Sequence, residues 1–187
     1  MFLLKSNLKK ESEQLIGKLL EHYYEINEGI GVHKSPELYG AFPIDPYSHT
    51  PYGKGAQQPG MTGQVKEDIL ARYGELGVFV EDGKLCFNPC LLRKEEFFTE
   101  ASSFEYIDIF KNKKEISMGK ESLGFTYCQV PIVYQISEQD RIELTFKDGS
   151  IKTINCLTID KSTSEKIFMR TGELTQVKAS INSSHLK

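Results

Sequence analysis

Apolar residues recur at intervals of three, four and seven positions near the beginning of the chain: Leu8, Leu15, Leu19, Tyr23 and Ile26. This spacing predicts an amphipathic helix, because residues so spaced share one helical face. Ile16, Leu20 and Tyr24 widen that face, and Gly29 with Gly31 end the helix. We expect so wide an apolar face to pack against a neighbouring element.

Residues 30–60 form a long irregular stretch that contains five of the seven prolines of the chain. A loop of this length is uncommon in a compact domain unless it is functional or disordered. Its enrichment in Tyr, Phe and His, rather than Ser, Glu and Lys, favours an ordered loop. We therefore look for chemistry in this segment.

A second helix is predicted to begin near Thr62, as N-cap, and to end at Gly74 or Gly77. Glu67 in its early part suits the positive end of the helix dipole. Its buried face is expected at four positions: Val65, Ile69, Leu70 and Tyr73.

After Gly77 the pattern changes to alternation of apolar and polar residues. Asp82-Gly83 and Asp148-Gly149 lie between such runs, and Asp-Gly pairs are strong hairpin signals. Pro131 predicts a bent or edge strand where it interrupts a longer apolar run. That run and three further predicted strands span residues 125–136, 104–110, 166–170 and 174–179.

Many short strands with regular turn signals predict an antiparallel β-sandwich. The chain is therefore predicted to be an α+β protein with two domains. N-terminal helices and the long Pro-rich loop occupy residues 1–76, and the sandwich occupies residues 77–187.

Composition and charge narrow the class of protein. The 187 residues are 39% hydrophobic and 26% charged, as in globular proteins, which excludes wholesale disorder. A net charge of −3 without a basic block argues against nucleic acid as a partner. No apolar run has the length of a membrane span or of a signal peptide, so we expect no membrane partner and a cytoplasmic location.

The four cysteines are scattered, and no second Cys or His pair completes a zinc-ligand spacing. We therefore expect free, mostly buried thiols and neither a metal nor a cofactor.

The Pro-rich loop and the start of the second helix carry the side chains that a carbohydrate site needs. Amides and carboxylates bind vicinal hydroxyls, and flat rings cover the C–H face of a sugar. The candidate ligand-binding residues are Asp45, Tyr47, His49, Tyr52, Gln57, Gln58 and Gln64. The alternative is structural, because short polar side chains also bond to their own loop backbone.

Asp45 and Glu67 are the candidate catalytic pair, since glycoside hydrolysis needs two carboxylates that flank one bond. Glu67 has a plainer role beside a helix N-terminus, and His49 with Asp45 offers a base and its orienting partner. Later in the chain, "SLGFTYCQVPIVYQI" holds Tyr127, Gln129 and Tyr134, which suit either a ligand groove or, more simply, strand packing.

The string "DPYSHTPYGKGAQQPGMTGQVKEDILARYGELGVFVEDGKLCFNPCLL", with "SLGFTYCQVPIVY" later, resembles the C-terminal portion of bacterial six-hairpin glycosidases and cellobiose-phosphorylase-like proteins. The resemblance implies the end of an (α/α)6 barrel followed by a small β-sandwich. It departs from the family because nearly all of the barrel, and most of its substrate groove, has no counterpart in the chain.

Three hypotheses of function follow. The leading one is a terminal fragment or stand-alone relative of a carbohydrate-active protein, non-catalytic alone, which binds an oligosaccharide or docks onto a partner. The second is a small glycosidase-like enzyme that uses Asp45 and Glu67. The third is a purely structural module. The first helix is expected to pair with a second copy of the chain or with a barrel partner; the alternative is that it folds down on the sandwich.

Overall fold

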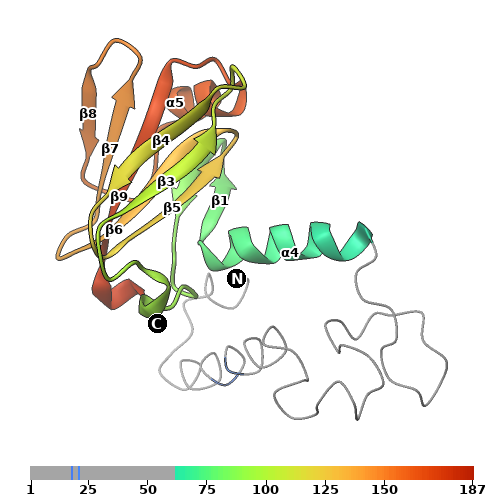
Figure 1. Cartoon of the computed structure of the whole chain (residues 1–187), viewed down its shortest axis with the longest axis vertical. Coiled ribbons are helices and arrows are strands. Elements are labelled where there is room, and N and C mark those ends of the chain that lie inside the picture. The colour runs from blue at the N-terminus through green and yellow to red at the C-terminus, as the bar shows by residue number, and fades with distance from the viewer. Residues whose placement is uncertain (1–17, 19–20, 22–61) are drawn as a thin grey trace. The chain divides into compact units, whose positions relative to one another are not determined.

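The computed structural model describes Lys18, Glu21 and residues 62–187 of the chain (Figure 1). The chain divides into two units, residues 1–72 and 73–187. Lys18 and Glu21 are helical, as predicted for the first helix. The rest of that helix and the Pro-rich loop lie outside the described residues, so pairing through the first helix stays a prediction.

The second predicted helix is confirmed as α4, Thr62–Glu75. Arg72 lies in its last turn, where a cation suits the negative end of the helix dipole. Tyr73 packs against the core, as predicted. Ile69 and Leu70 are 52% and 71% exposed, so the prediction that they are buried is wrong.

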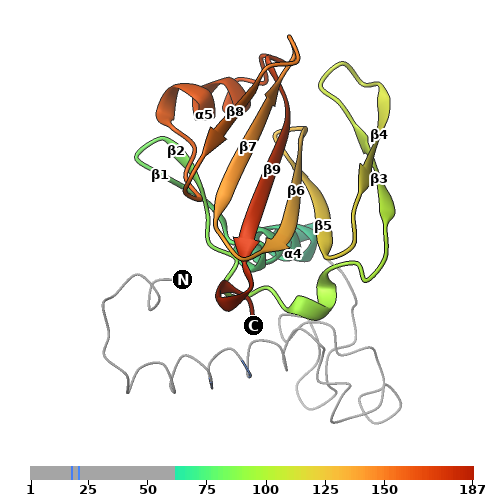
Figure 2. The same cartoon turned by 90° about the vertical axis from the view of Figure 1, so that its left-hand side faces the viewer.

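A five-stranded mixed sheet forms the centre of the C-terminal unit, residues 73–187 (Figure 2). Its spatial order is β5, β6, β9, β7, β8. β9 runs parallel to β6 and antiparallel to β7, so it lies between two strands that follow each other in the sequence. The strands are β5 (Ser122–Tyr127), β6 (Val130–Ser137), β7 (Arg141–Phe146), β8 (Ile151–Ile154) and β9 (Leu174–Asn182).

Two antiparallel hairpins and a further helix flank this sheet. In Figures 1 and 2 the β3–β4 hairpin lies on one side of the sheet, and α5 with the β1–β2 hairpin lies on the other. The bounds are Val78–Glu81 for β1, Lys84–Phe87 for β2, Ser102–Ile107 for β3, Lys113–Met118 for β4 and Lys161–Phe168 for α5, with short 3₁₀ turns at Lys94–Glu96 and Ser183–His185.

The predicted α+β fold, with N-terminal helices followed by an antiparallel β-sandwich, is wrong. In the described part of the chain β-strands predominate, α4 and α5 are the only α-helices described from end to end, and the C-terminal unit has one large sheet with a parallel pair and two separate hairpins. Helix α5 covers most of residues 166–170, which were expected to be a strand. Asp160 caps this helix, since its carboxylate accepts a hydrogen bond of 2.9 Å from the backbone N–H of Thr163. Residues 125–136 form two strands, because Cys128 and Gln129, with φ of 50° and 63°, make a tight turn between β5 and β6.

Alternation along the strands gives the sheet two different faces. One face joins the apolar core, whose fully buried members include Tyr134, Ile142, Leu144, Ile167 and Val177. On the other face, Gly124 of β5 lies beneath the β3–β4 hairpin. A Cβ at Gly124 would stand 2.8 Å from both Phe104 Cγ and Met118 Sδ, so the hairpin lies this close because Gly124 has no side chain.

Candidate binding cleft

A cleft of about 390 Å³ opens at the end of the β3–β4 hairpin. Three segments that are distant in the sequence build it: the loop of residues 108–112 between β3 and β4, the start of β6 with its preceding turn, and residues 172–175 at the start of β9. Tyr106 of β3, Lys114 of β4 and Lys147, directly after β7, complete the lining. The volume lies within the range of small-ligand sites, about 300–1,000 Å³.

Part of the lining is apolar and consists of the buried side chains of Val130, Pro131 and Leu174. Ile109 and Phe110 add apolar surface from the 108–112 loop, and Phe110 is 62% exposed. A Cβ at Gly172 would stand 2.7 Å from Ile109 Cδ1 and 3.3 Å from Phe110 Cζ. Gly172 therefore permits the close approach of this loop to the segment before β9.

Asp108 holds the 108–112 loop in shape. Its carboxylate accepts hydrogen bonds of 2.8 Å from the backbone N–H groups of Phe110 and Asn112, and one of 3.3 Å from the Asn112 amide. Partial desolvation alone would raise the pKa of Asp108, but these hydrogen bonds and the nearby Lys114 ammonium together lower it. The carboxylate is therefore ionised at neutral pH, and its oxygens serve the loop.

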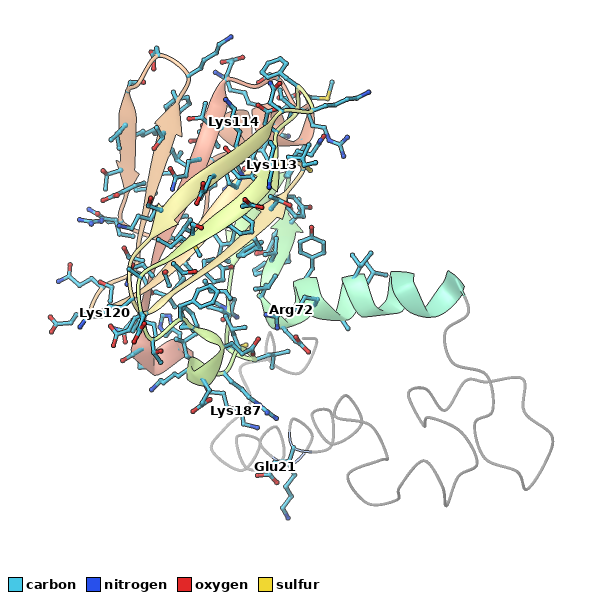
Figure 3. All side chains as sticks on the ribbon, viewed as in Figure 1. Glu21, Arg72, Lys113, Lys114, Lys120 and Lys187 are labelled. Atoms are coloured by element: carbon cyan, nitrogen blue, oxygen red, sulfur yellow. The ribbon has the colours of Figure 1, made fainter. Side chains whose placement is uncertain are left out.

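Two ammonium groups line the cleft. Lys114 of β4 (labelled in Figure 3) lies opposite Tyr106 in the hairpin register. Alternation therefore places both side chains on the same face of the hairpin, and both line the cleft. The Nζ of Lys147 stands 6.0 Å from the centroid of the Phe110 ring, which is within reach of a cation–π contact. Both cations thus lie beside aromatic surface.

Three neutral polar side chains complete the lining. Desolvation and then the charge of Asp108 raise the pKa of Tyr106, so its hydroxyl is neutral at physiological pH. The Gln129 amide donates a hydrogen bond of 3.3 Å to the Asp108 carbonyl, and the Thr175 hydroxyl donates one of 3.0 Å to the Thr145 carbonyl. The amide oxygen and the hydroxyls retain acceptor capacity for a ligand.

The candidate residues from the loop stay predictions. Asp45, Tyr47, His49, Tyr52, Gln57 and Gln58 lie outside the described residues. Gln64 and Glu67 belong to helix α4, but their side chains also lie outside the description. The convergence of these groups, and the pairing of Asp45 with Glu67, are therefore untested.

Strand packing is confirmed as the main role of the run "SLGFTYCQVPIVYQI", and the ligand-groove interpretation stays a prediction. Tyr134 is fully buried, and Tyr127 packs edge-on against Tyr73 and Phe168, as strand packing predicts. Gln129, in the turn, lines the cleft.

Sequence reasoning missed Tyr106, Phe110, Lys114 and Lys147. They come from separate turns and strand ends, so no short motif joins them. No strand was predicted at residues 113–118, where the structure has β4, so the position of Lys114 on the same face as Ile116 and Met118 was not foreseen.

A second, wholly polar depression is lined by residues 137–141 and Asn155. There, Asp140 accepts a hydrogen bond of 2.8 Å from the backbone N–H of Asn182 and lies 3.3 Å from His185 Nδ1. These contacts fasten the end of β9 and the following turn, so Asp140 has a structural role.

Within the part of the chain that the structure describes, no three His, Cys, Asp or Glu side chains gather as metal ligands would. All four cysteines are free. No described helix combines the length and the apolar character needed to cross a bilayer.

No family model matches the chain, and no curated protein matches it either. The resemblance to six-hairpin glycosidases therefore stays a prediction.

Proposed function

We propose that the C-terminal unit is a non-catalytic binding module whose cleft takes an oligosaccharide. The observation that carries the proposal is the meeting of aromatic rings and neutral polar groups in one open cleft, Tyr106 and Phe110 with Asn112, Gln129 and Thr175. Aromatic faces cover the C–H surface of a sugar, and amides and hydroxyls bind its hydroxyl groups.

The exposed ring of Phe110 supports a binding role. A phenyl ring that is 62% exposed leaves a large apolar area in water, and stacking of a sugar would cover it. The loop that carries Phe110 is held by the Asp108 hydrogen bonds, so little freedom is lost when a ligand binds.

The same lining favours binding over catalysis. Glycoside hydrolysis requires two carboxyl groups roughly 5–10 Å apart. Among the described residues that line the cleft, Asp108 is the only carboxylate, and its oxygens already accept hydrogen bonds from its own loop. The proposal therefore keeps a carbohydrate-related function without turnover by this unit.

The cytoplasmic location remains part of the proposal, because reduced cysteines are the rule in the cytoplasm.

The test is to titrate the whole chain with a panel of neutral and acidic oligosaccharides and to measure the affinity for each by calorimetry. Phe110→Ala is expected to weaken binding by about tenfold, since stacked aromatic contacts contribute about 0.5–1.5 kcal/mol beyond buried area. Phe98→Ala is the matched control, because Phe98 is 45% exposed and does not line the cleft. Absence of binding to every oligosaccharide, or equal loss in both variants, would show that the proposal is wrong.

A further inference from the structure

Positive groups outnumber negative ones in the lining of the cleft, and the negative group is less available to a ligand. The lining holds two ammonium groups, Lys114 and Lys147, and one carboxylate, Asp108. Three hydrogen bonds from within its own loop engage that carboxylate. A net charge of −3 for the whole chain makes this local positive balance a property of the cleft rather than of the protein surface at large.

Neither cation forms an ion pair with a described carboxylate, although the Lys114 ammonium is near enough to Asp108 to lower the pKa of that carboxyl group. Lys113, Lys152 and Lys166 form ion pairs of 2.7, 2.9 and 2.6 Å with Glu105, Asp160 and Glu173. Lys114 and Lys147 form no ion pair with any residue in the described part of the chain. Their charges therefore remain available to a ligand.

The apolar walls around these cations strengthen their attraction for an anion. Pro131 and Leu174 are buried beside the cleft, and the Phe110 ring lies against Lys147. Apolar walls lower the local dielectric constant and focus the field of a single-sign cleft on its ligand. An anion that enters gains more from each ammonium here than it would on an open surface.

We infer that the cleft selects an anionic oligosaccharide, one whose sugar carries an oxyanion that Lys114 and Lys147 bind while the ring stacks on the aromatic wall. This inference rests on the proposed function and adds the charge of the ligand. A carboxylate, a sulfate and a phosphate share the required chemistry; the experiment tests the carboxylate on a sugar and compares it with a free anion.

The probes are a uronic-acid oligosaccharide, the same oligosaccharide with its carboxylates methyl-esterified, and inorganic phosphate. At low salt the acid form is expected to bind at least about tenfold more tightly than the ester, because a hydrogen bond to a charged group contributes more than a neutral one. This preference should fall as salt is added. Inorganic phosphate alone should compete only weakly, because it cannot stack.

The variants are Lys114→Gln and Lys147→Gln, with Lys113→Gln as the matched control on the opposite face of the same strand. Each cleft variant is expected to lower affinity for the acid form about tenfold and to lower affinity for the ester far less. Lys113→Gln should change neither. Thermal unfolding of each variant verifies that the fold is intact.

The outcomes separate the inference from the proposed function. Equal binding of acid and ester, with loss in Phe110→Ala, would overturn the anionic preference and leave oligosaccharide binding in place. Binding of the acid form that is insensitive to both cleft variants would also overturn it. If neither form binds while another neutral oligosaccharide of the panel does, the anionic preference is wrong, and if no oligosaccharide binds, both ideas are wrong. If inorganic phosphate binds as tightly as the acid form, the cleft is a general anion site. That result would overturn the inference that the ligand is a sugar.

Discussion

The phenol oxygen of Tyr134 donates a hydrogen bond of 2.7 Å to the backbone carbonyl of Leu76. Tyr134 lies in β6 and is fully buried, and Leu76 directly follows helix α4. The rings of Phe87 and Phe125 contact Tyr134 edge-on, at centroid distances of 5.8 and 5.0 Å. A fully buried polar contact thus joins the end of the helix to the interior of the sheet, beside the part-buried hydrogen bond of 2.9 Å that the Tyr73 hydroxyl donates to the Thr126 carbonyl.

Tyr134→Phe is expected to destabilise the protein by about 1–3 kcal/mol, because the variant leaves the buried carbonyl of Leu76 without its donor while keeping the aromatic packing. Chemical denaturation measures this change. Tyr127→Phe is the control: Tyr127 is half-buried and contacts its neighbours through its ring, so a change below about 0.5 kcal/mol is expected. Equal effects of the two substitutions would contradict a special role for the Tyr134 hydroxyl.

Burial also makes the contribution of Tyr134 dependent on pH. Desolvation raises its pKa well above the usual value of 10.0, so the folded state holds the phenol proton more tightly than the unfolded state does. The resulting stability is fully present below about pH 10 and is lost as the pH rises above that value toward the folded pKa. From pH 9 to pH 11, wild type should therefore lose more unfolding free energy than Tyr134→Phe, by up to about 1.4 kcal/mol per pH unit. Equal losses of unfolding free energy in wild type and Tyr134→Phe would refute a raised pKa of Tyr134 as the cause.

Local turn chemistry was the most predictable part of the fold. Asp82-Gly83 and Asp148-Gly149 both form the hairpin turns expected of them, because the residues that set the required positive φ lie within the turn itself. The parallel pairing of β6 with β9 was not predictable in this way. It matches Ile132 with Val177, and no local pattern specifies a partner so distant in the sequence.

Helix α5 shows a different limit of secondary-structure prediction from sequence. Its eight residues are too few for apolar periodicity to decide between helix and strand, and the decisive signal is the Asp160 cap. The cleft was beyond prediction for the same reason as the parallel pair. Lys114 and Lys147 come together only after the β3–β4 hairpin packs near the start of β9.

Packing of the β3–β4 hairpin on the sheet should depend on Gly124. Gly124→Ala places a Cβ 2.8 Å from Phe104 Cγ, an atom near the backbone that cannot easily move away, so the hairpin has to shift. We expect a loss of about 1–3 kcal/mol in unfolding free energy. Gly74→Ala is the control, because a Cβ there meets no atom within 4 Å and Ala is the better helix former. That variant should gain about 0.5–1 kcal/mol, and similar losses in both would contradict the packing argument.

Alanine substitutions at Gly172 and Gly149 distinguish the effect of the shape of the cleft on binding from the effect of backbone strain on stability. Both have positive φ, 76° and 84°, so an alanine at either position carries a similar backbone cost of about 1–2 kcal/mol. A Cβ at Gly149 meets no atom within 4 Å, whereas a Cβ at Gly172 meets Ile109 Cδ1 at 2.7 Å and Phe110 Cζ at 3.3 Å. Because these atoms end mobile side chains, they can move aside without a large further loss of stability.

The two substitutions should therefore lower the unfolding free energy by similar amounts and differ in ligand binding. Gly172→Ala displaces Ile109 and Phe110 from the cleft wall, so affinity for an oligosaccharide ligand should fall about tenfold. Gly149→Ala leaves the wall unchanged and should bind as wild type does. Calorimetric titration of both variants, with thermal unfolding measured in parallel, makes the comparison. Wild-type affinity in Gly172→Ala would mean that the Ile109–Phe110 wall does not contact the ligand.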